Sequence, residues 1–131
     1  MASRLRLSPA LLCGLAALAA PLLAQAASTG DAAKGAALFK QRCSACHTAV
    51  DDGKPHPAPT LQGVVGRKAG SLAAFKGYSP GLKALGKTWD RASLDAFLAM
   101  PAKQVPGTFM VISLPKADER QDVLAYLATL K

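Results

Sequence analysis

Apolar residues recur at helical spacing in three parts of the chain, residues 31–42, 90–100 and 118–130. A shorter helical turn is expected over residues 80–85. The connections, chiefly residues 50–77, are rich in Gly and Pro, which favour turns and loops. No segment shows the strict alternation of apolar and polar residues that is typical of a β-strand. The pattern therefore predicts an all-α fold with three main helices and short turns.

The middle helix shows this pattern most clearly. Asp90 is a residue type that caps helix N-termini. After it, Leu94, Phe97 and Leu98 recur at i, i+3 and i+4, and Pro101 is expected to end the helix. These three side chains are therefore predicted to face the core.

The first and last helices are predicted to pack against each other. Leu38 and Phe39 lie on one face of the first helix, where Gly35 allows another helix to approach closely. Asp118, followed by Gln121 three residues later, is expected to begin the last helix. Its inward positions are Val123, Leu124, Leu127 and Leu130, with Tyr126 beside them.

The N-terminal segment differs in composition from the rest. Two arginines precede an Ala/Leu-rich run over residues 10–24, and small residues follow at the positions that a signal peptidase reads. We expect residues 1–26 to be a signal peptide, cleaved after Ala26, which leaves residues 27–131 as one domain exported to the periplasm. The apolar run is short for a membrane span, and a retained anchor is the alternative.

Composition and charge narrow the functional classes. Half of the residues are apolar, which excludes a disordered or collagen-like chain. Sixteen Lys and Arg against eight Asp and Glu give a net charge of +8, which favours acidic partners. Nucleic acid is not expected, because no stacking aromatics accompany the scattered basic residues. Aromatic residues make up only 5% of the chain, which is few for a small core.

One motif carries chemistry, the Cys-x-x-Cys-His sequence at residues 43–47. This spacing is typical of covalent attachment of haem c. On a helical turn, the thiols of Cys43 and Cys46 can reach two vinyl groups along one porphyrin edge, and His47 then points its imidazole at the iron. A shift of one residue would turn any of these side chains by about a hundred degrees around the helix.

Two other interpretations of the motif are weaker. A zinc site would need two more ligands at suitable spacing, and only His56 remains. A redox-active dithiol of the thioredoxin type would need a βαβ setting, and no alternating strand precedes the cysteines. A haem would also supply the apolar mass that the few aromatics do not, so we expect the chain without haem to be largely unfolded.

A second iron ligand is sought farther along the chain among Met100, Met110 and His56. Met110 lies in a segment punctuated by Pro and Gly, and such a loop can carry a thioether to the haem. Met100 ends an apolar helical pattern and is expected to pack in the core, whereas His56 lies between two prolines close to His47. Met110 is therefore the predicted ligand. A thioether opposite an imidazole favours ferrous iron and fills the coordination sphere, which suits electron transfer.

With these motifs, the chain resembles class I cytochrome c of the mitochondrial and bacterial short-chain type, over nearly all of its predicted mature region. The resemblance implies the class I cytochrome c fold, wrapped around one covalent haem c, and identifies residues 27–131 as a monohaem domain. Beyond residues 43–47, it rests on five ordered matches, at residues 66–70, 87–89, 101–103, 106–110 and 125–127.

The resemblance implies a set of haem-contacting residues. His47 and Met110 are the axial ligands, and the Pro59 carbonyl accepts the second ring N–H of His47. Near the haem propionates it implies three donors: Arg67, Tyr78 and Trp89. The alternatives are core packing for Trp89 and a solvated surface position for Arg67.

The chain departs from the family pattern at several positions. Phe97 stands where many relatives have a tyrosine, Phe109 replaces a common lysine, and Ile112 stands where an aromatic residue is usual. One extra residue lies between Arg67 and Tyr78. These changes affect the surroundings of the haem and the partner surface, and leave the fold expectation unchanged.

The function that follows is a soluble electron carrier and not an enzyme. The resemblance places Arg42, Lys103 and Lys116 around an exposed haem edge, where positive charge would steer acidic redox proteins into transient contact. Membrane cytochrome complexes, oxidases and other periplasmic oxidoreductases are the expected partners of a monomer. The alternatives are a haem c subunit of an oxidoreductase complex, a small peroxidase, or a gas-binding haem sensor.

Overall fold

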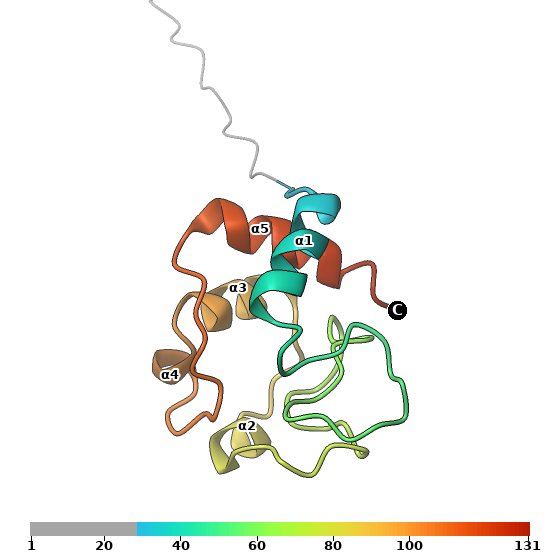
Figure 1. Ribbon diagram of the computed structural model, residues 1–131. Helices are drawn as coiled ribbons and strands as arrows, with labels where there is room; N and C mark the ends of the chain where they lie inside the picture. The colour runs from blue at the N-terminus through green and yellow to red at the C-terminus, as the bar shows by residue number, and fades with distance from the viewer. Residues whose placement is uncertain (1–28) are drawn as a thin grey trace, which may run out of the picture.

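The computed structural model describes residues 29–131, so the expected signal peptide lies outside the described part. Its helices follow one another along the chain without an intervening strand in this range, and a single antiparallel bridge joins Lys68 to Thr88. The prediction of an all-α fold is therefore confirmed (Figure 1). The helices are α1 (Ala32–Arg42), α2 (Pro80–Ala84), α3 (Arg91–Ala99), α4 (Pro101–Gln104) and α5 (Ala117–Leu127).

Helices α1 and α5 cross at one end of the molecule, which brings the first and last helices of the described chain together (Figure 1). Gly35 lies at the crossing, where a Cβ atom would overlap the backbone carbonyl of Asp122. The rings of Phe39 and Tyr126 pack beside it with centroids 5.4 Å apart. The close approach predicted for Gly35 is thus present, and it depends on the missing side chain.

The caps of these helices follow from short polar side chains. Asp31 caps α1 by accepting hydrogen bonds from the N–H groups of Ala33 and Lys34, and these bonds lower the pKa of its carboxyl group. Asp90 caps α3 in a reciprocal arrangement with Ser93. The Asp90 cap stands where the sequence predicts it, whereas Asp31, predicted as the first residue of its helix, is the cap that precedes it.

Several helix boundaries differ from the prediction, and α5 ends at Leu127 rather than at Leu130. Pro101 ends α3, but it also begins the four-residue helix α4, because the first position of a helix needs no backbone N–H. Helix α5 begins at Ala117 rather than at Asp118, without a side-chain cap. Asp118 and Glu119 lie in its first turn, where negative charge is favourable to the helix dipole.

The apolar faces of α3 and α5 meet in the core, below the crossing of α1 and α5. The predicted core positions of α3 are all buried, as are three of the four predicted for α5, whereas Leu130 is partly buried. The long connection between α1 and α2 wraps the opposite side (Figure 1). Within residues 29–131, no helix has the length and apolar character needed to cross a membrane.

Candidate functional site

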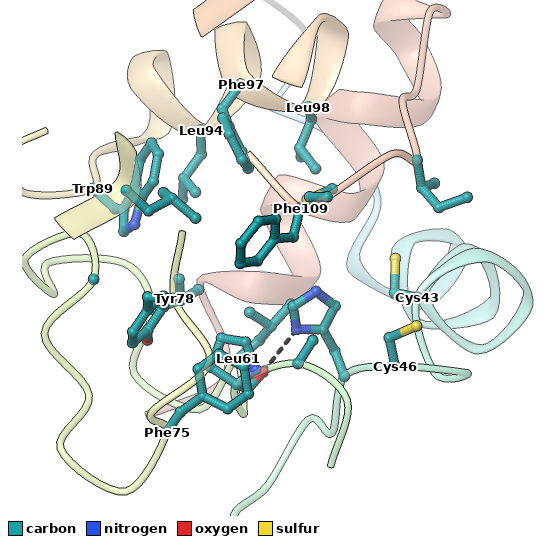
Figure 2. A pocket seen from close by; sticks show the side chains of 18 of the residues that line it. Cys43, Cys46, Leu61, Phe75, Tyr78, Trp89, Leu94, Phe97, Leu98 and Phe109 are labelled. Carbon is teal, nitrogen blue, oxygen red and sulfur yellow. Dashed lines mark hydrogen bonds between the residues drawn. The ribbon is translucent and has the colours of Figure 1, made fainter. Parts of the chain in front are cut away.

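A cavity of about 380 Å³ lies between the helices and the long connection. Its walls are mainly apolar, and they come from parts of the chain that are far apart in sequence (Figure 2). Every haem-contacting residue implied by the resemblance lines it: Cys43, Cys46, His47, Pro59, Arg67, Tyr78, Trp89 and Met110.

The other two candidate ligands lie elsewhere. Met100 follows the last turn of α3 and is 48% exposed, so the expectation that it packs in the core is wrong, and it does not line the cavity. His56 borders a separate hollow, and its ring Nε2 lies 2.8 Å from a carboxylate oxygen of Asp52. Of the three residues weighed as a second ligand, Met110 alone therefore faces the same cavity as His47.

The Cys-x-x-Cys-His motif continues the chain directly from α1. Cys43 is the C-cap of that helix, and its N–H donates to the carbonyl of Phe39. The N–H of His47 then donates to the carbonyl of Cys43 at 2.9 Å, which closes one more turn. Both cysteines are free thiols on this turn (Figure 2), and burial raises the pKa of the Cys43 thiol.

The imidazole of His47 is oriented by the backbone. Its Nδ1 lies 2.7 Å from the Pro59 carbonyl oxygen, the hydrogen bond drawn as a dashed line in Figure 2. A carbonyl can only accept, so Nδ1 carries the proton and Nε2 keeps its lone pair. Burial lowers the pKa of His47, and Pro59 opposes this shift while the Arg67 charge adds to it. The result is a neutral imidazole with one nitrogen available to a metal.

Met110 lies on the connection between α4 and α5, which is held at both sides. Before it, the N–H of Thr108 donates to the carbonyl of Val105, a residue only 2% exposed. After it, the N–H of Leu114 donates to the carbonyl of Leu98 on α3 at 2.8 Å. These two hydrogen bonds hold the chain before and after Met110, and so they keep this loop residue at the cavity wall.

The charges around the cavity are of one sign. Arg42, Arg67 and Lys68 contribute to the lining, and no Asp or Glu is among the residues that line it. Arg67 donates through Nη1 to the Gln62 carbonyl and through Nη2 to the Thr60 carbonyl, at 3.0 and 2.9 Å. Its Nε is buried without a protein partner. Because a buried unpaired donor is costly, this Nε suits an anionic group such as a haem propionate.

The two remaining donors, Trp89 and Tyr78, each pack against another aromatic ring of the cavity wall. Trp89 is buried and packs against Phe97 with ring centroids 5.2 Å apart, so it is a core residue as well as part of the lining (Figure 2). The rings of Tyr78 and Phe75 lie nearly perpendicular to each other, with centroids 4.9 Å apart. Burial raises the pKa of Tyr78, which keeps its phenol a neutral donor near neutral pH.

The resemblance implied Pro59, Arg67 and Tyr78 on the long connection between α1 and α2, but the sequence did not indicate the apolar contribution of this connection. Leu61, Val64 and Phe75 line the cavity from this Gly/Pro-rich stretch, and its backbone carbonyls hold Arg67. Isolated apolar residues within a polar loop were the available signal, since a fully solvated loop has no use for them. The apolar lining and the cationic donors together fit a large, flat, partly anionic cofactor.

Comparisons with known proteins place this geometry in context. The family model described as cytochrome c matches residues 32–131. Cytochrome c2 of Rhodomicrobium vannielii is 46% identical over 107 residues, which is 81% of this chain and 84% of that protein. Cytochrome c of Tetrahymena pyriformis is 44% identical over 102 residues, covering 77% and 90% of the two chains.

A solved structure is similar as well. Cytochrome cH from Methylobacterium extorquens aligns with a TM-score of 0.68 at 46% sequence identity, over 76% of this chain and 99% of that one. The likeness therefore extends to both ends of a known structure.

Removal of both attachment thiols should unfold the domain. Without haem, the mainly apolar walls of the cavity would be exposed to water, and a small domain has little stability to offset this loss of buried apolar area. We expect Cys43→Ala with Cys46→Ala to lose most of the helical signal in far-UV circular dichroism. Ala45→Ser, an exposed change between the thiols, should leave it intact. A cooperative, helical double variant without haem would contradict this expectation.

Proposed function

The chain belongs to the cytochrome c family, and from this premise we propose that it is a soluble periplasmic electron carrier whose haem iron is held by His47 and Met110. Cys43 and Cys46 attach one haem c in the spacing of the family. Bound haem c supplies a one-electron iron couple. The observation that carries the proposal is that one imidazole and one thioether line the same cavity.

His47 is prepared for ligation before any metal is bound. The Pro59 carbonyl fixes the tautomer and orientation of the ring, so Nε2 needs no reorganisation to bind. Burial favours the neutral form that a metal requires. The backbone hydrogen bond also raises the basicity of the ligand.

Met110 distinguishes a carrier from an enzyme or a sensor. Its soft thioether favours the reduced metal and raises the reduction potential. With His47 it would complete the coordination of a bound haem iron, which would leave no position for peroxide or a gas. A peroxidase, a catalytic haem subunit or a gas sensor would need this position open or weakly held.

Arg67, Tyr78 and Trp89 are proposed to neutralise and solvate the haem propionates inside the protein. Arg67 is held by two backbone carbonyls and has one buried N–H without a partner. The phenol and the indole are further donors on the same cavity wall. Such donors offset the cost of burying a carboxylate, which is otherwise several kcal/mol.

The proposed docking face is the rim of the cavity around Met110. Phe109, Val111 and Ile112 line the cavity while remaining 71%, 88% and 46% exposed. Residues 96–117 contain no Asp or Glu. An apolar rim in a positively charged setting suits partners with an apolar contact site ringed by carboxylates.

The partners proposed for this face are acidic redox proteins. These are membrane cytochrome complexes, oxidases or other periplasmic oxidoreductases, which would bind a monomer transiently. Lys103 and Lys116 lie on either side of the rim in sequence, and Arg42 lines the cavity itself. Their charge would speed the encounter, whereas the exposed apolar side chains would exclude water at the contact.

Export is the remaining part of the proposal. The signal-like features of residues 1–26 support cleavage after Ala26 and haem attachment in the periplasm. The intact mass of the purified protein should equal that of residues 27–131 plus one haem. A mass that retains the N-terminal segment would favour the anchored alternative.

Replacing Met110 by Ala should remove the sulfur ligand. The weak band near the red end of the ferric spectrum, which reports sulfur ligation, is expected to disappear. The reduction potential should fall by a sizeable part of the about 0.8 V range that axial ligands cover. Optical spectra and redox titration measure both effects.

The matched control is Met100→Ala, which changes an exposed methionine outside the cavity and should leave band and potential unchanged. If Met110→Ala leaves both unchanged, Met110 is not the ligand. Ready binding of carbon monoxide to the reduced, unaltered protein would favour a sensor or an enzyme.

The charge of the docking face should make electron exchange depend on salt. With a purified acidic redox protein, the bimolecular rate is expected to fall about tenfold or more between low and high ionic strength. Lys103→Gln with Lys116→Gln should slow the reaction at low salt and flatten this dependence. Lys34→Gln with Lys54→Gln removes the same charge at positions that do not line the cavity and is the matched control. A rate indifferent to salt would exclude electrostatic steering.

A further inference from the structure

The chain that carries Met110 regains a helix only at Ala117. Between Met110 and that helix, residues 111–116 belong to no helix or strand. Leu114 is the first of them to be buried, at 2% exposure. The position of the thioether therefore depends on how firmly the chain is held at Leu114 and just beyond it.

The guanidinium group of Arg120 holds the chain at Leu114 and Pro115. Nη1 of Arg120 donates to the Leu114 carbonyl at 2.9 Å and to the Pro115 carbonyl at 2.8 Å. The side chain of Arg120 is only 12% exposed. Arg120 thus ties the loop to α5 through two adjacent peptide groups.

A carboxylate on another helix orients that guanidinium. Nε of Arg120 donates to Oδ1 of Asp95 at 2.8 Å, and Nε2 of Gln121 donates to the same oxygen at 3.1 Å. Asp95 lies on α3, one turn before Leu98, whose carbonyl accepts from the N–H of Leu114. The loop is therefore attached to α3 twice, directly through Leu98 and indirectly through Asp95 and Arg120.

We propose that Asp95 is a positioning residue for the sulfur ligand: by orienting Arg120, it fixes the Leu114–Pro115 peptide groups and holds the Met110 thioether at the iron. The inference rests on the proposed ligation by His47 and Met110. Asp95 does not line the cavity, so its effect must pass through Arg120 and the backbone.

The expected effect follows from a local opening equilibrium. Without the carboxylate, Nε of Arg120 turns to water, and the guanidinium loses one of the contacts that fix its plane. The loop then visits the state with Met110 displaced more often. An external ligand that binds only in this state gains apparent affinity in proportion to its population.

The experiment uses the ferric holoprotein and imidazole as the competing ligand, followed by the loss of the sulfur band. For Asp95→Ala we expect imidazole to bind roughly threefold to tenfold more tightly, the lower figure reflecting the partial exposure of this pair. Asp95→Asn keeps an oxygen that can accept from Nε of Arg120. The affinity of this variant for imidazole should therefore stay within about twofold of that of the unaltered protein.

The matched control is Glu119→Gln, which breaks the exposed ion pair to Lys116 in the first turn of α5. This pair lies next to the loop but does not contact the Leu114 or Pro115 carbonyl, so imidazole affinity should not change. Arg120→Lys should weaken the hold as Asp95→Ala does, and the double variant should add little, since both changes act on one contact.

Thermal unfolding, followed by far-UV circular dichroism, separates positioning from general stability. If Asp95→Ala lowers the unfolding midpoint but leaves imidazole affinity unchanged at 25 °C, Asp95 is merely structural and the inference is overturned. If the unaltered protein lacks the sulfur band, the ligation by Met110 fails, and the inference fails with it. A band that is present, with equal imidazole affinity in both proteins, overturns the inference alone.

Discussion

The fold depends on a space that its own side chains do not fill. The helices and the long connection surround a cavity of about 380 Å³ with apolar walls, at the place where a small domain normally has its core. Two consequences follow from this constraint. A prosthetic group must complete the interior, and the residues that line the space become its ligands and contacts. Stability and function are therefore determined by the same set of side chains.

The backbone of the fold could be predicted wherever short polar side chains mark the helix ends. Asp31 and Asp90 are local signals, and each caps the helix that the apolar pattern indicates. Helix α4 was missed because Pro101 signals the end of one helix as well as the beginning of another. A sequence pattern alone does not show that the chain turns and continues as a helix at that residue.

In the candidate site, the sequence could predict the side chains that act but not the backbone groups that hold them. The Cys-x-x-Cys-His motif has a spacing with a chemical meaning, and the family resemblance supplied Arg67, Tyr78 and Trp89. The carbonyls of Thr60, Gln62, Leu114 and Pro115 hold the arginines in place, but every residue type has such a carbonyl. Only the folded chain shows which of them are used.

The crossing of α1 and α5 joins the first and the last helices of the described chain at Gly35. During synthesis, α1 therefore has no packing partner until the C-terminal residues have emerged. The Asp31 N–H and the Asp122 carboxylate that meet at this crossing are 91 positions apart in the sequence, so pairing these helices closes nearly the whole described chain into one loop, at a cost in chain entropy.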